Sequence, residues 1–318
     1  MSAPKVLALT GGVGGAKLGL GLAHCLPSEN LAFVVNTGDD FEHLGLPISP
    51  DLDTLLYTLA GEVHEDQGWG RRDETWTVLN TLERLGGASW FRLGDKDLAL
   101  HLRRRETLAS GARLTQAMAL LGDAFSVPFP LLPMSDDPVR TVLTTREFGR
   151  LPFQSYFVRE RCAPTVQAIA YEGAGAAGLS PEVAAALADP ALDLIVLCPS
   201  NPYLSIAPLL AIPPLRKALE RRRVPAVAVC PLVGGAAVKG PTAKLMDELH
   251  VPRTPASIAR YYGGVIDGLI LDEQDRHHAD AVRAEGVTPD VAPTVMLTLG
   301  DKITLAQRTL AFGETLRG

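Results

Sequence analysis

The sequence predicts an α/β fold: a Rossmann-like three-layer core around a mostly parallel sheet, with a mostly helical insertion. Three observations carry this prediction. Short apolar runs alternate with helix-like segments along most of the 318 residues, and a glycine-rich segment directly follows the first apolar run. Residues 62–124 interrupt the alternation with helix-like segments that contain no convincing strand. Strands that alternate with helices are typical of a parallel sheet covered on both faces.

Composition indicates a large core and argues against several function classes. Hydrophobic residues make up 47% of the chain and the formal net charge is −6. This charge argues against a nucleic-acid-binding surface, which would be basic. Two basic runs, residues 103–105 and 221–223, fall in predicted helices and are interpreted as solvated faces. We find no signal peptide and no apolar stretch long enough to cross a membrane, so we expect a cytoplasmic protein with no membrane or nucleic-acid partner.

The four cysteines predict no metal or disulfide framework. They are far apart and form no C-x-x-C motif: Cys25, Cys162, Cys198 and Cys230. Cys198 and Cys230 each end an apolar, strand-like run and are interpreted as small buried side chains. This pattern fits a reducing cytosol.

The first strand, residues 6–9, leads into glycines and then into a helix over residues 17–26. A strand, a glycine loop and a helix start together present free backbone N–H groups and a positive helix end, which favours a phosphate. The candidate phosphate-binding residues are Gly11, Gly12, Gly14 and Lys17. The G-x-G-x-x-G pattern fails because its third glycine falls on Lys17, and the Walker pattern fails because Leu18 follows that lysine. The alternative is a glycine-rich turn that binds no ligand.

Acidic residues follow the second strand, residues 31–35, and begin the next helix. Ser49 and Pro50 form a helix start, and Gly61 lies past the helix end. Carboxylates from these two loops suit Mg²⁺, which takes oxygen ligands and bridges diphosphates. We assign Asp40 and Asp51 to the metal, and Asp40 and Asp53 to catalysis, where they place the metal or accept a proton. An acid in a helical first turn also favours the helix dipole, which is the alternative for Asp51.

The helical insertion, residues 62–124, separates two parts of the nucleotide-binding core, residues 1–61 and 125–318. Its predicted helices span residues 73–85, 98–110 and 114–121. Lys96 lies between two aspartates and is explained either by an ion pair at a helix start or by contact with an anionic or polar substrate. Trp69, Trp76 and Trp90 either form a pocket for a flat ring or pack the helices, and packing is the preferred interpretation.

Further strands are predicted over residues 130–133, 166–170, 194–198, 226–230, 265–271 and 291–296, and a last helix over residues 302–316. Polar loops follow most of them. Ser135 and Asp136 lie in one such loop, with a plain turn as the alternative. Ser200 and Asn201 lie in a second, with a structural Asn-Pro turn as the alternative.

A third polar loop, residues 233–244, is a second candidate anion cradle and contains Gly234 and Lys239. In open parallel sheets, ligands bind beyond the carboxyl ends of the strands, so these loops predict one extended cleft. The chain has no nucleophilic serine elbow and no catalytic cysteine motif. Transfer of a phosphate-linked group by positioning and charge neutralisation suits this set of residues.

Several segments together resemble one enzyme family. They are LTGGVGGAK, VVNTGDD, ISPDLDTLLYTL, WGRRDETW, LGDKDLALHL, LLPMSDDPV, PSNPYLSI and GPTAKLM, and they occur in that order along nearly the whole chain. In these segments the sequence resembles the 2-phospho-L-lactate transferase family, the enzymes called CofD and FbiA in the pathway to the deazaflavin coenzyme F(420).

The resemblance implies a Rossmann-like core with an added helical part, a homodimer and a requirement for Mg²⁺. It also implies a reaction. The terminal ribityl hydroxyl of 7,8-didemethyl-8-hydroxy-5-deazariboflavin attacks the outer phosphorus of a guanosine-diphosphate-linked lactate, enolpyruvate or glycerate, and GMP leaves. No residue in the sequence reports which of the three donors is used.

The resemblance also assigns residues. It places Asp53 and Lys96 at the deazaflavin, to which we add Ser135 and Asp136 as binding candidates. It places the glycine loop and the PSNP segment, with Gly11, Gly12, Ser200 and Asn201, at the guanosine diphosphate. We expect Asp53→Asn to abolish transfer and leave the fold intact.

Two rival interpretations remain. One is a non-enzymatic regulator of the YvcK-like gluconeogenesis-factor group, which binds a nucleotide sugar and in which SPDLDT and LGDKD are not expected. The other is a Rossmann dehydrogenase. It is disfavoured by Lys17 at the third-glycine position and by the lack of a catalytic His or Tyr-Lys pair.

Overall fold

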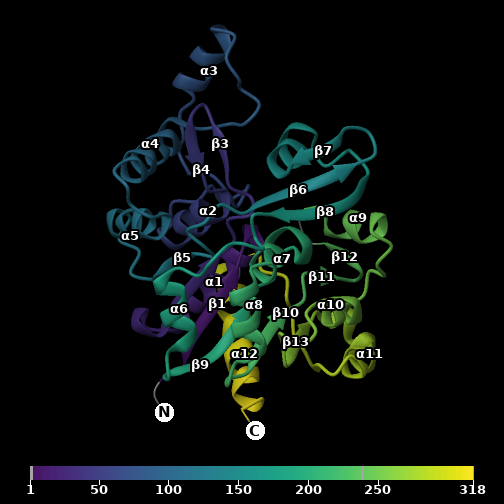
Figure 1. Ribbon diagram of the computed structural model, residues 1–318. Helices are drawn as coiled ribbons and strands as arrows, with labels where there is room; N and C mark the ends of the chain where they lie inside the picture. Colours follow the sequence, from purple (N-terminus) through teal and green to yellow (C-terminus); the bar gives the residue numbers. More distant parts are fainter. Residues whose placement is uncertain (1–2, 238–239, 318) are drawn as a thin grey trace.

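The computed structural model describes residues 3–237 and 240–317. In this part of the chain, a seven-stranded sheet forms the centre of the molecule, in the order β14–β13–β10–β9–β1–β2–β5 (Figure 1). Neighbouring strands are parallel throughout. The strands are β1 (Lys5–Thr10), β2 (Leu31–Val35), β5 (Leu131–Pro133), β9 (Leu192–Leu197), β10 (Ala226–Val229), β13 (Gly268–Leu271) and β14 (Thr288–Val291). The parallel sheet that the sequence predicts is confirmed.

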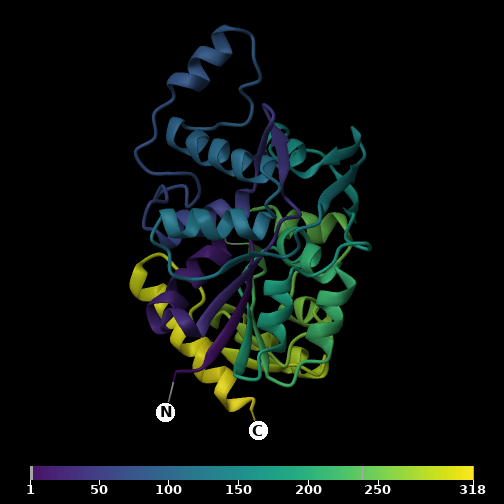
Figure 2. The same cartoon turned by 60° about the vertical axis from the view of Figure 1, so that its left-hand side comes forward.

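Helices cover both faces of this sheet because its central strands are apolar on both sides. In β1, Val6 and Ala8 belong to one core cluster, whereas Leu7 and Leu9 belong to the other. The first face packs against α1 (Gly12–Cys25), α2 (Pro50–Leu59), α5 (Leu114–Ala124) and α12 (Leu299–Thr315). The second packs against α6 (Pro181–Ala188), α7 (Ala207–Leu210), α8 (Pro213–Glu220), α9 (Thr242–Glu248), α10 (Pro255–Tyr261) and α11 (Ala279–Ala284). Figure 2 shows α12, in yellow, beside α1 on the first face.

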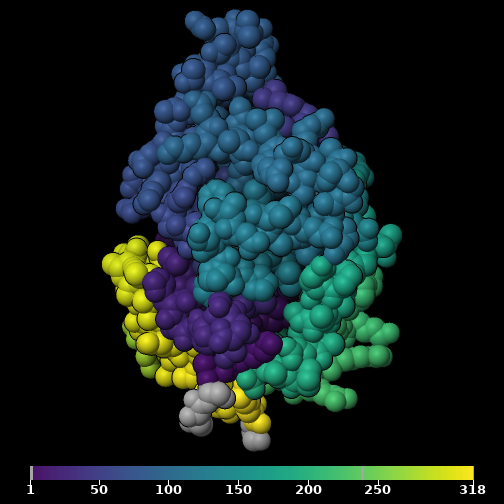
Figure 3. Space-filling model, turned by 90° about the vertical axis from the view of Figure 1, so that its left-hand side faces the viewer, coloured from purple at the N-terminus to yellow at the C-terminus, as the bar shows by residue number. Residues whose placement is uncertain are grey.

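The insertion consists of helices, as predicted, and it packs on the first face of the sheet. It holds α3 (Thr77–Arg84), α4 (Asp95–Ala109) and α5. Leu100 of α4 and Met118 of α5 belong to the same core cluster as α1 and α2, so these two helices share the core. α3 stands at the far end, opposite both chain termini (Figure 1). In Figure 3 the insertion, in blue, narrows to this tip above the body of the molecule.

Three small antiparallel sheets were not predicted. They are the hairpin β3 (Phe41–His43) and β4 (Leu46–Ile48), the sheet of β6 (Arg140–Thr145), β7 (Gly149–Pro152) and β8 (Val166–Glu172), and the hairpin β11 (Leu232–Val233) and β12 (Ala236–Ala237). The strand predicted over residues 166–170 is therefore wrong in its placement, because β8 pairs antiparallel with β6 outside the central sheet. Exposed and buried residues alternate in β6, which is the pattern of a one-sided antiparallel strand.

Two predicted boundaries are also wrong. α1 begins at Gly12 rather than at residue 17, so the glycines form its first turn instead of a separate loop. β14 ends at Val291, where the strand over 291–296 was predicted to begin. That apolar run instead crosses the end of α1, where the Nζ of Lys17 donates a hydrogen bond to the carbonyl oxygen of Met296 (2.8 Å). Short 3₁₀ or π turns complete the chain at Ser28–Asn30, Ser155–Arg159, Pro202–Ile206 and Glu273–His278.

Candidate active site

A cavity of about 1320 Å³ lies between the carboxyl ends of the central strands and the helical insertion. β1 occupies the centre of the sheet, with β2 on one side and β9 on the other, so the strand order reverses there. Ligands of open parallel sheets bind at this reversal point. The loops after β1 and β9 both line the cavity, and so do residues of the insertion. The extended cleft predicted from the polar loops is therefore present.

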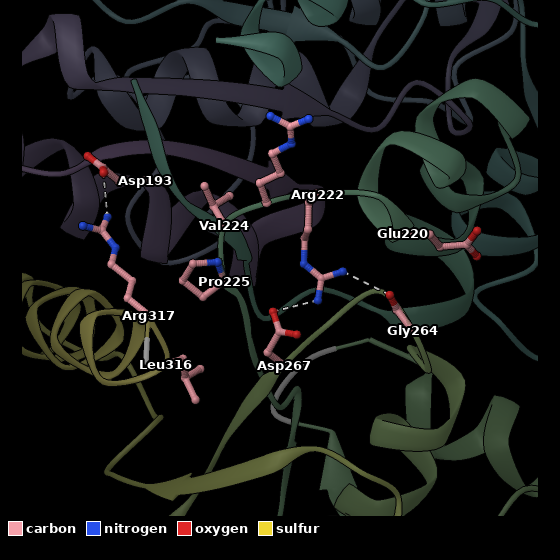
Figure 4. Close-up of a pocket in the computed structure, with 10 residues that line it drawn as sticks. Asp193, Glu220, Arg222, Val224, Pro225, Gly264, Asp267, Leu316 and Arg317 are labelled. Carbon is pink, nitrogen blue, oxygen red and sulfur yellow. Dashed lines mark hydrogen bonds and ion pairs between the residues drawn. The ribbon is translucent and has the colours of Figure 1, made fainter. Parts of the chain in front are cut away.

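A second hollow, about 650 Å³, lies at the amino ends of β9, β10 and β13 and has a different character (Figure 4). The carboxylate of Asp193 pairs with Arg317 (3.0 Å), and that of Asp267 pairs with Arg222 (2.7 Å). The Arg222 guanidinium also donates to the carbonyl oxygen of Gly264 (3.0 Å). These charged side chains are paired with one another, and their contacts hold the starts of the strands together. Because this hollow is explained by its structural contacts, we take the larger cavity as the candidate site.

The first turn of α1 faces the large cavity. Its N-cap residue, Gly11, has no side chain with which to cap the helix, and the Gly12 backbone N–H donates to the Asp51 carboxylate. Gly11, Gly12 and Gly14 line the cavity, as predicted. The positive end of a 14-residue helix favours an anion at this point. The glycine loop and the cavity thus coincide.

The glycines are also needed so that neighbouring loops can approach α1. A Cβ atom on Gly11 would lie 2.6 Å from Oδ2 of Asp51, and one on Gly14 would collide with the carbonyl oxygen of Pro199. Gly12 has a φ of +64°, a conformation that side chains disfavour. Glycine is therefore needed at these positions for two reasons. It lets the neighbouring loops pack closely against α1, and it leaves the backbone accessible to an anion.

The PSNP segment after β9 combines a structural turn with free donors. The Asn201 Oδ1 accepts hydrogen bonds from the backbone N–H groups of Tyr203 (3.0 Å) and Leu204 (3.1 Å), which makes it a helix cap. Its Nδ2 is buried and has no hydrogen-bond partner among the described residues. Ser200 and Asn201 both line the cavity. Asn201 can therefore act both as a structural turn residue and as a ligand-binding residue, because Oδ1 caps the turn and Nδ2 is a separate donor.

Two buried acids, Asp39 and Asp51, line the cavity beside α1. The Asn36 Nδ2 donates to Oδ2 of Asp51 (2.9 Å). Burial raises the pKa of Asp51 to about 6, against the lowering effect of hydrogen bonds from Asn36 and the Gly12 backbone. Burial, followed by the nearby Asp51 charge, raises the pKa of Asp39 well above its usual value. The Oδ1 of Asp39 has no hydrogen-bond partner within the described ranges.

Asp40, predicted for metal and catalysis, lies just outside this pair. It is buried, but it is not among the residues that line the cavity. Its Oδ2 accepts a hydrogen bond from Ser49 Oγ (2.7 Å), and burial raises its pKa to about 8. The turn after β2 instead turns Asp39 toward the cavity. The sequence indicates the pair of acids but not which of the two faces the ligand.

Asp53 lines the cavity, as predicted, and is held from behind by Arg104. Both oxygens of Asp53 accept hydrogen bonds from the Arg104 guanidinium, at 3.1 Å for Nη1 to Oδ2 and by a shorter contact from Nη2 to Oδ1. Arg104 is 0% exposed. The interpretation of residues 103–105 as a solvated face is therefore wrong for its middle residue, because α4 packs that one side chain inward against α2.

Lys96, Ser135 and Asp136 do not line the cavity. Lys96 is exposed in the first turn of α4, whereas Asp97 and His101 of the same helix do line it. The Ser135 Oγ donates to the carbonyl oxygen of Gly178 (2.6 Å). Asp136 accepts from the backbone N–H of Thr115 (2.8 Å) and so holds the start of α5. The structure gives these last two residues anchoring contacts at the insertion boundary.

The second predicted anion cradle is only partly at the site. Gly234 is not a lining residue, and its N–H donates to Oδ2 of Asp275 (2.8 Å). Lys239 lies outside the described residues. Gly240 and Thr242 of the same loop do line the cavity. Lys17 lines it as well, with the Met296 contact described above.

The insertion supplies an aromatic wall. Trp69, Trp76 and Trp90 all line the cavity, together with Phe91 and Phe157. Trp90 also packs against Phe41 and Phe91, so the preferred packing interpretation holds for that residue, and all three rings face the cavity as well. Arginine side chains lie over two of the rings: Arg92 over Trp76 at 4.3 Å and Arg159 over Trp90 at 4.5 Å from the ring centroids. The wall thus combines flat apolar surfaces with positive charge.

A metal site made of protein side chains alone is not found. Within residues 3–237 and 240–317, no group of three or more His, Cys, Asp or Glu side chains is placed to hold a metal ion. Mg²⁺ is commonly bound through one or two carboxylates plus substrate phosphates, so this result does not conflict with a shared site. The unpartnered Oδ1 of Asp39 beside Asp51 fits such an ion. Separately, none of the helices in the described chain has the length and apolar character needed to span a bilayer.

Comparisons with known proteins identify the family and the fold. Residues 6–298 match the family described as 2-phospho-L-lactate transferase CofD. A protein of Kitasatospora aureofaciens named phosphoenolpyruvate transferase is 40% identical over 98% of this chain and 99% of its own length. A Methanosarcina mazei protein named 2-phospho-L-lactate transferase is 35% identical over 95% of this chain and 98% of its own length. A solved UPF0052-family structure from Bacillus halodurans aligns with a TM-score of 0.63 at 15% identity, covering 98% of this chain and 100% of that one, and shows the fold alone.

Proposed function

We propose a specific reaction for this chain, which belongs to the 2-phospho-L-lactate transferase CofD family. The chain moves a phospho-linked three-carbon acid from a guanosine-diphosphate-linked donor to the ribityl hydroxyl of 7,8-didemethyl-8-hydroxy-5-deazariboflavin, in coenzyme F(420) biosynthesis. One observation carries the proposal beyond the family. A single cavity is lined by the glycine-rich start of α1, by buried acids and by an aromatic wall.

The diphosphate of the donor is assigned to the first turn of α1. The backbone N–H groups there and the Ser200 hydroxyl offer donors to phosphate oxygens. The Asn201 Nδ2, buried without a partner in the described chain, offers one more. These groups are fixed by the fold, so they stabilise negative charge in the transition state without reorganising.

The tricyclic acceptor is assigned to the aromatic wall. Flat rings gain dispersion and offset stacking against tryptophan faces. Trp69, Trp76 and Trp90 come from the insertion, whereas Asp53 comes from the core, so an acceptor between them presents its ribityl chain toward the acids. This direction brings the terminal hydroxyl toward the donor.

The reaction is a displacement at phosphorus. The hydroxyl oxygen of the acceptor forms a bond to the outer phosphorus, and the bond from that phosphorus to the bridging oxygen breaks. GMP leaves with the bridging oxygen, and a carboxylate of the site takes the hydroxyl proton. Asp53 is assigned this last role, because its carboxylate lines the cavity and is not among the acids assigned to the metal.

Mg²⁺ is proposed as the cofactor. Asp39 and Asp51 are the residues that would hold it, and the ion would neutralise charge on the diphosphate. Asp39 thereby replaces Asp40 in the metal assignment, since only the former lines the cavity.

Among the three donors, we propose the enolpyruvate form as the first to test. The 40% identical relative carries the name phosphoenolpyruvate transferase, and the 35% identical one carries the name 2-phospho-L-lactate transferase. We further propose a cytoplasmic homodimer, as the family resemblance implies; light scattering of the purified chain measures the assembly.

The test is a transfer assay with defined substrates. The purified chain is mixed with the deazaflavin alcohol, MgCl₂ and each guanosine-diphosphate-linked donor in turn, and products are identified by mass spectrometry. The proposal expects a product heavier than the alcohol by the phospho-acid group, together with GMP, and no product in EDTA. Tight guanosine nucleotide binding without any product from the three donors would favour the regulator interpretation.

A further inference from the structure

We infer that Arg104 is a positioning residue of the proposed transferase: it fixes the Asp53 carboxylate in the orientation that accepts a hydrogen bond from the attacking hydroxyl. The inference rests on the proposed function and extends it to a residue that does not line the cavity. Arg104 belongs to the insertion and Asp53 to the core, so the insertion would set the geometry of the core's acid.

The Asp53 side chain is mostly buried and is accessible to a ligand from the cavity. This residue lies in the first turn of α2, where its backbone N–H donates to the carbonyl oxygen of Ser49 (3.0 Å). Its carboxylate is 5% exposed and forms part of the cavity wall. Only a small face of the carboxylate is therefore open to a ligand.

Arg104 holds the opposite side of that carboxylate by two parallel hydrogen bonds. A fork of this kind fixes the plane of the carboxylate, which a single-point contact does not. The Arg104 Nη1 also lies 3.4 Å from the carbonyl oxygen of Pro47, and Nη2 lies 3.8 Å from the sulfur of Met118. The guanidinium itself therefore has little freedom to rotate.

His101 extends this arrangement to a second acid of the cavity. Its Nδ1 lies 3.3 Å from Arg104 Nη1. Arginine has only donors, so a hydrogen bond between the two side chains uses Nδ1 as the acceptor; Nδ1 also lies 3.8 Å from Oδ2 of Asp53. The Nε2 faces Oδ2 of Asp97 at 3.4 Å, and the Tyr57 hydroxyl donates to Oδ1 of Asp97 (2.5 Å). Tyr57, Asp97 and His101 all line the cavity, so one connected group of side chains spans its wall.

A contribution to stability is a poor explanation for the buried Arg104–Asp53 pair. The free-energy cost of desolvating two charges is about as large as the gain from their attraction, and apolar side chains of similar size often stabilise a core equally well. A buried pair whose acid opens onto a ligand cavity has a further use, which is orientation. An attacking hydroxyl held in the right geometry gains rate through proximity, and small misplacements remove that gain.

The experiment is a double-mutant cycle on transfer kinetics. The variants are Arg104→Gln, Arg104→Lys, Asp53→Asn and the double variant Arg104→Gln/Asp53→Asn. Arg103→Gln is the matched control, because Arg103 is the preceding residue of α4 and its exposed side chain pairs with Glu106. For each, kcat and the KM values for donor and acceptor are measured, with thermal unfolding recorded alongside.

We expect Arg104→Gln to lower kcat/KM for the acceptor by about 100-fold, with the donor KM unchanged. Arg104→Lys should recover part of this loss, since it keeps the charge and can still donate to the carboxylate but lacks the planar fork. The double variant should match Asp53→Asn within about twofold, because Arg104 acts only through Asp53. Removing both charges together also avoids an unpaired buried ion, so the double variant is the one to examine where a single variant unfolds.

Three outcomes would overturn the inference while leaving the proposed function in place. They are near-normal acceptor kinetics in Arg104→Gln, a double-variant loss equal to the product of the single losses, or equal changes in donor and acceptor KM. A wild-type chain that transfers nothing from any donor overturns the proposed function, and this inference with it.

Discussion

Asp53 and Arg104 show how one residue can serve both the site and the fold. The sequence places Asp53 at the site through the SPDLDT segment and assigns it no structural role. In the structure its carboxylate is the counterion of a fully buried arginine. The expectation that Asp53→Asn leaves the fold intact therefore needs a physical revision.

We predict that Asp53→Asn lowers the free energy of unfolding by about 3 kcal/mol, because it leaves the buried Arg104 without its counterion. Urea denaturation followed by circular dichroism measures the change. Asp280→Asn is the control, since Asp280 pairs with Arg283 at an exposed position and its loss should cost less than about 1 kcal/mol. Equal stability of Asp53→Asn and wild type would contradict this prediction.

Asp39 and Asp40 provide a second contrast between neighbouring residues. We predict that Asp39→Asn lowers kcat by about 100-fold or more, because it removes a carboxylate from the cavity wall, where we propose that the metal and the diphosphate bind. Asp40→Asn, a change of the same chemistry one residue away, should cost much less. Steady-state assays at saturating donor and acceptor decide between them, and a larger loss in Asp40→Asn would restore the original metal assignment.

At the scale of elements, the site depends on how closely α1 approaches the loop after β9. Gly14 makes this approach possible, since a Cβ atom there has no room beside Pro199. The same contact places Ser200 and Asn201 next to the start of the helix. The packing of α1 against this loop therefore also assembles the proposed phosphate site.

We predict that Gly14→Ala lowers stability by about 2 kcal/mol through this collision and weakens guanosine diphosphate binding. Gly175→Ala is the matched control, because nothing lies within 4 Å of a Cβ atom at that glycine. Thermal unfolding and isothermal titration with guanosine diphosphate give the two quantities. Wild-type affinity in Gly14→Ala would show that the loop position is unimportant for the nucleotide.

The aromatic wall of the insertion allows a separate prediction for the acceptor. Trp69 lines the cavity yet is 48% exposed, so its removal should disturb the fold little. Trp69→Ala should weaken deazaflavin binding by about 1 kcal/mol, the value of one aromatic contact, and leave donor binding unchanged. Leu85→Ala, at an exposed insertion residue outside the cavity, is the control. Fluorescence titration of the deazaflavin measures the effect; an unchanged affinity would place the ring elsewhere.

For the molecule as a whole, the buried acids predict how stability depends on pH. The folded-state pKa of Asp40, about 8, lies above its usual 3.8, and that of Asp51, about 6, does too. Between these values the folded chain keeps protons that the unfolded chain releases. The free energy of unfolding therefore falls as pH rises through the folded-state values.

We predict that, in metal-free buffer, the melting temperature falls between about pH 6.5 and 8.5. Burial lowers the pKa of His43 below its usual 6.5, so the opposite contribution of this residue fades in the lower part of that window as the unfolded-state histidine loses its proton. Asp40→Asn removes one of these acid contributions, so its melting temperature should change less and exceed that of wild type at the upper end. Differential scanning fluorimetry in EDTA checks this, and a parallel decline of both proteins would refute it.

The sequence by itself determined the parallel core, the helical insertion and the glycine-rich end of the cavity, where we propose that phosphate binds. These features follow from local patterns: apolar runs, capping residues, and glycines between a strand and a helix. Gly11, Gly12, Gly14, Ser200 and Asn201 were predictable because parallel strand ends share one edge, whatever the details of packing.

Only the tertiary structure decided which neighbouring side chains face the cavity. Asp39 rather than Asp40 lines it, Asp97 and His101 rather than Lys96 do so, and Arg104 is buried between two exposed arginines. A rotation of one residue along a turn or a helix changes the direction of a side chain completely. That rotation is set by tertiary contacts such as those of α4 with β4 and with Asp53 of α2, which are distant from α4 in the chain. No local pattern records those contacts, so the tertiary fold alone selects the residues of the wall.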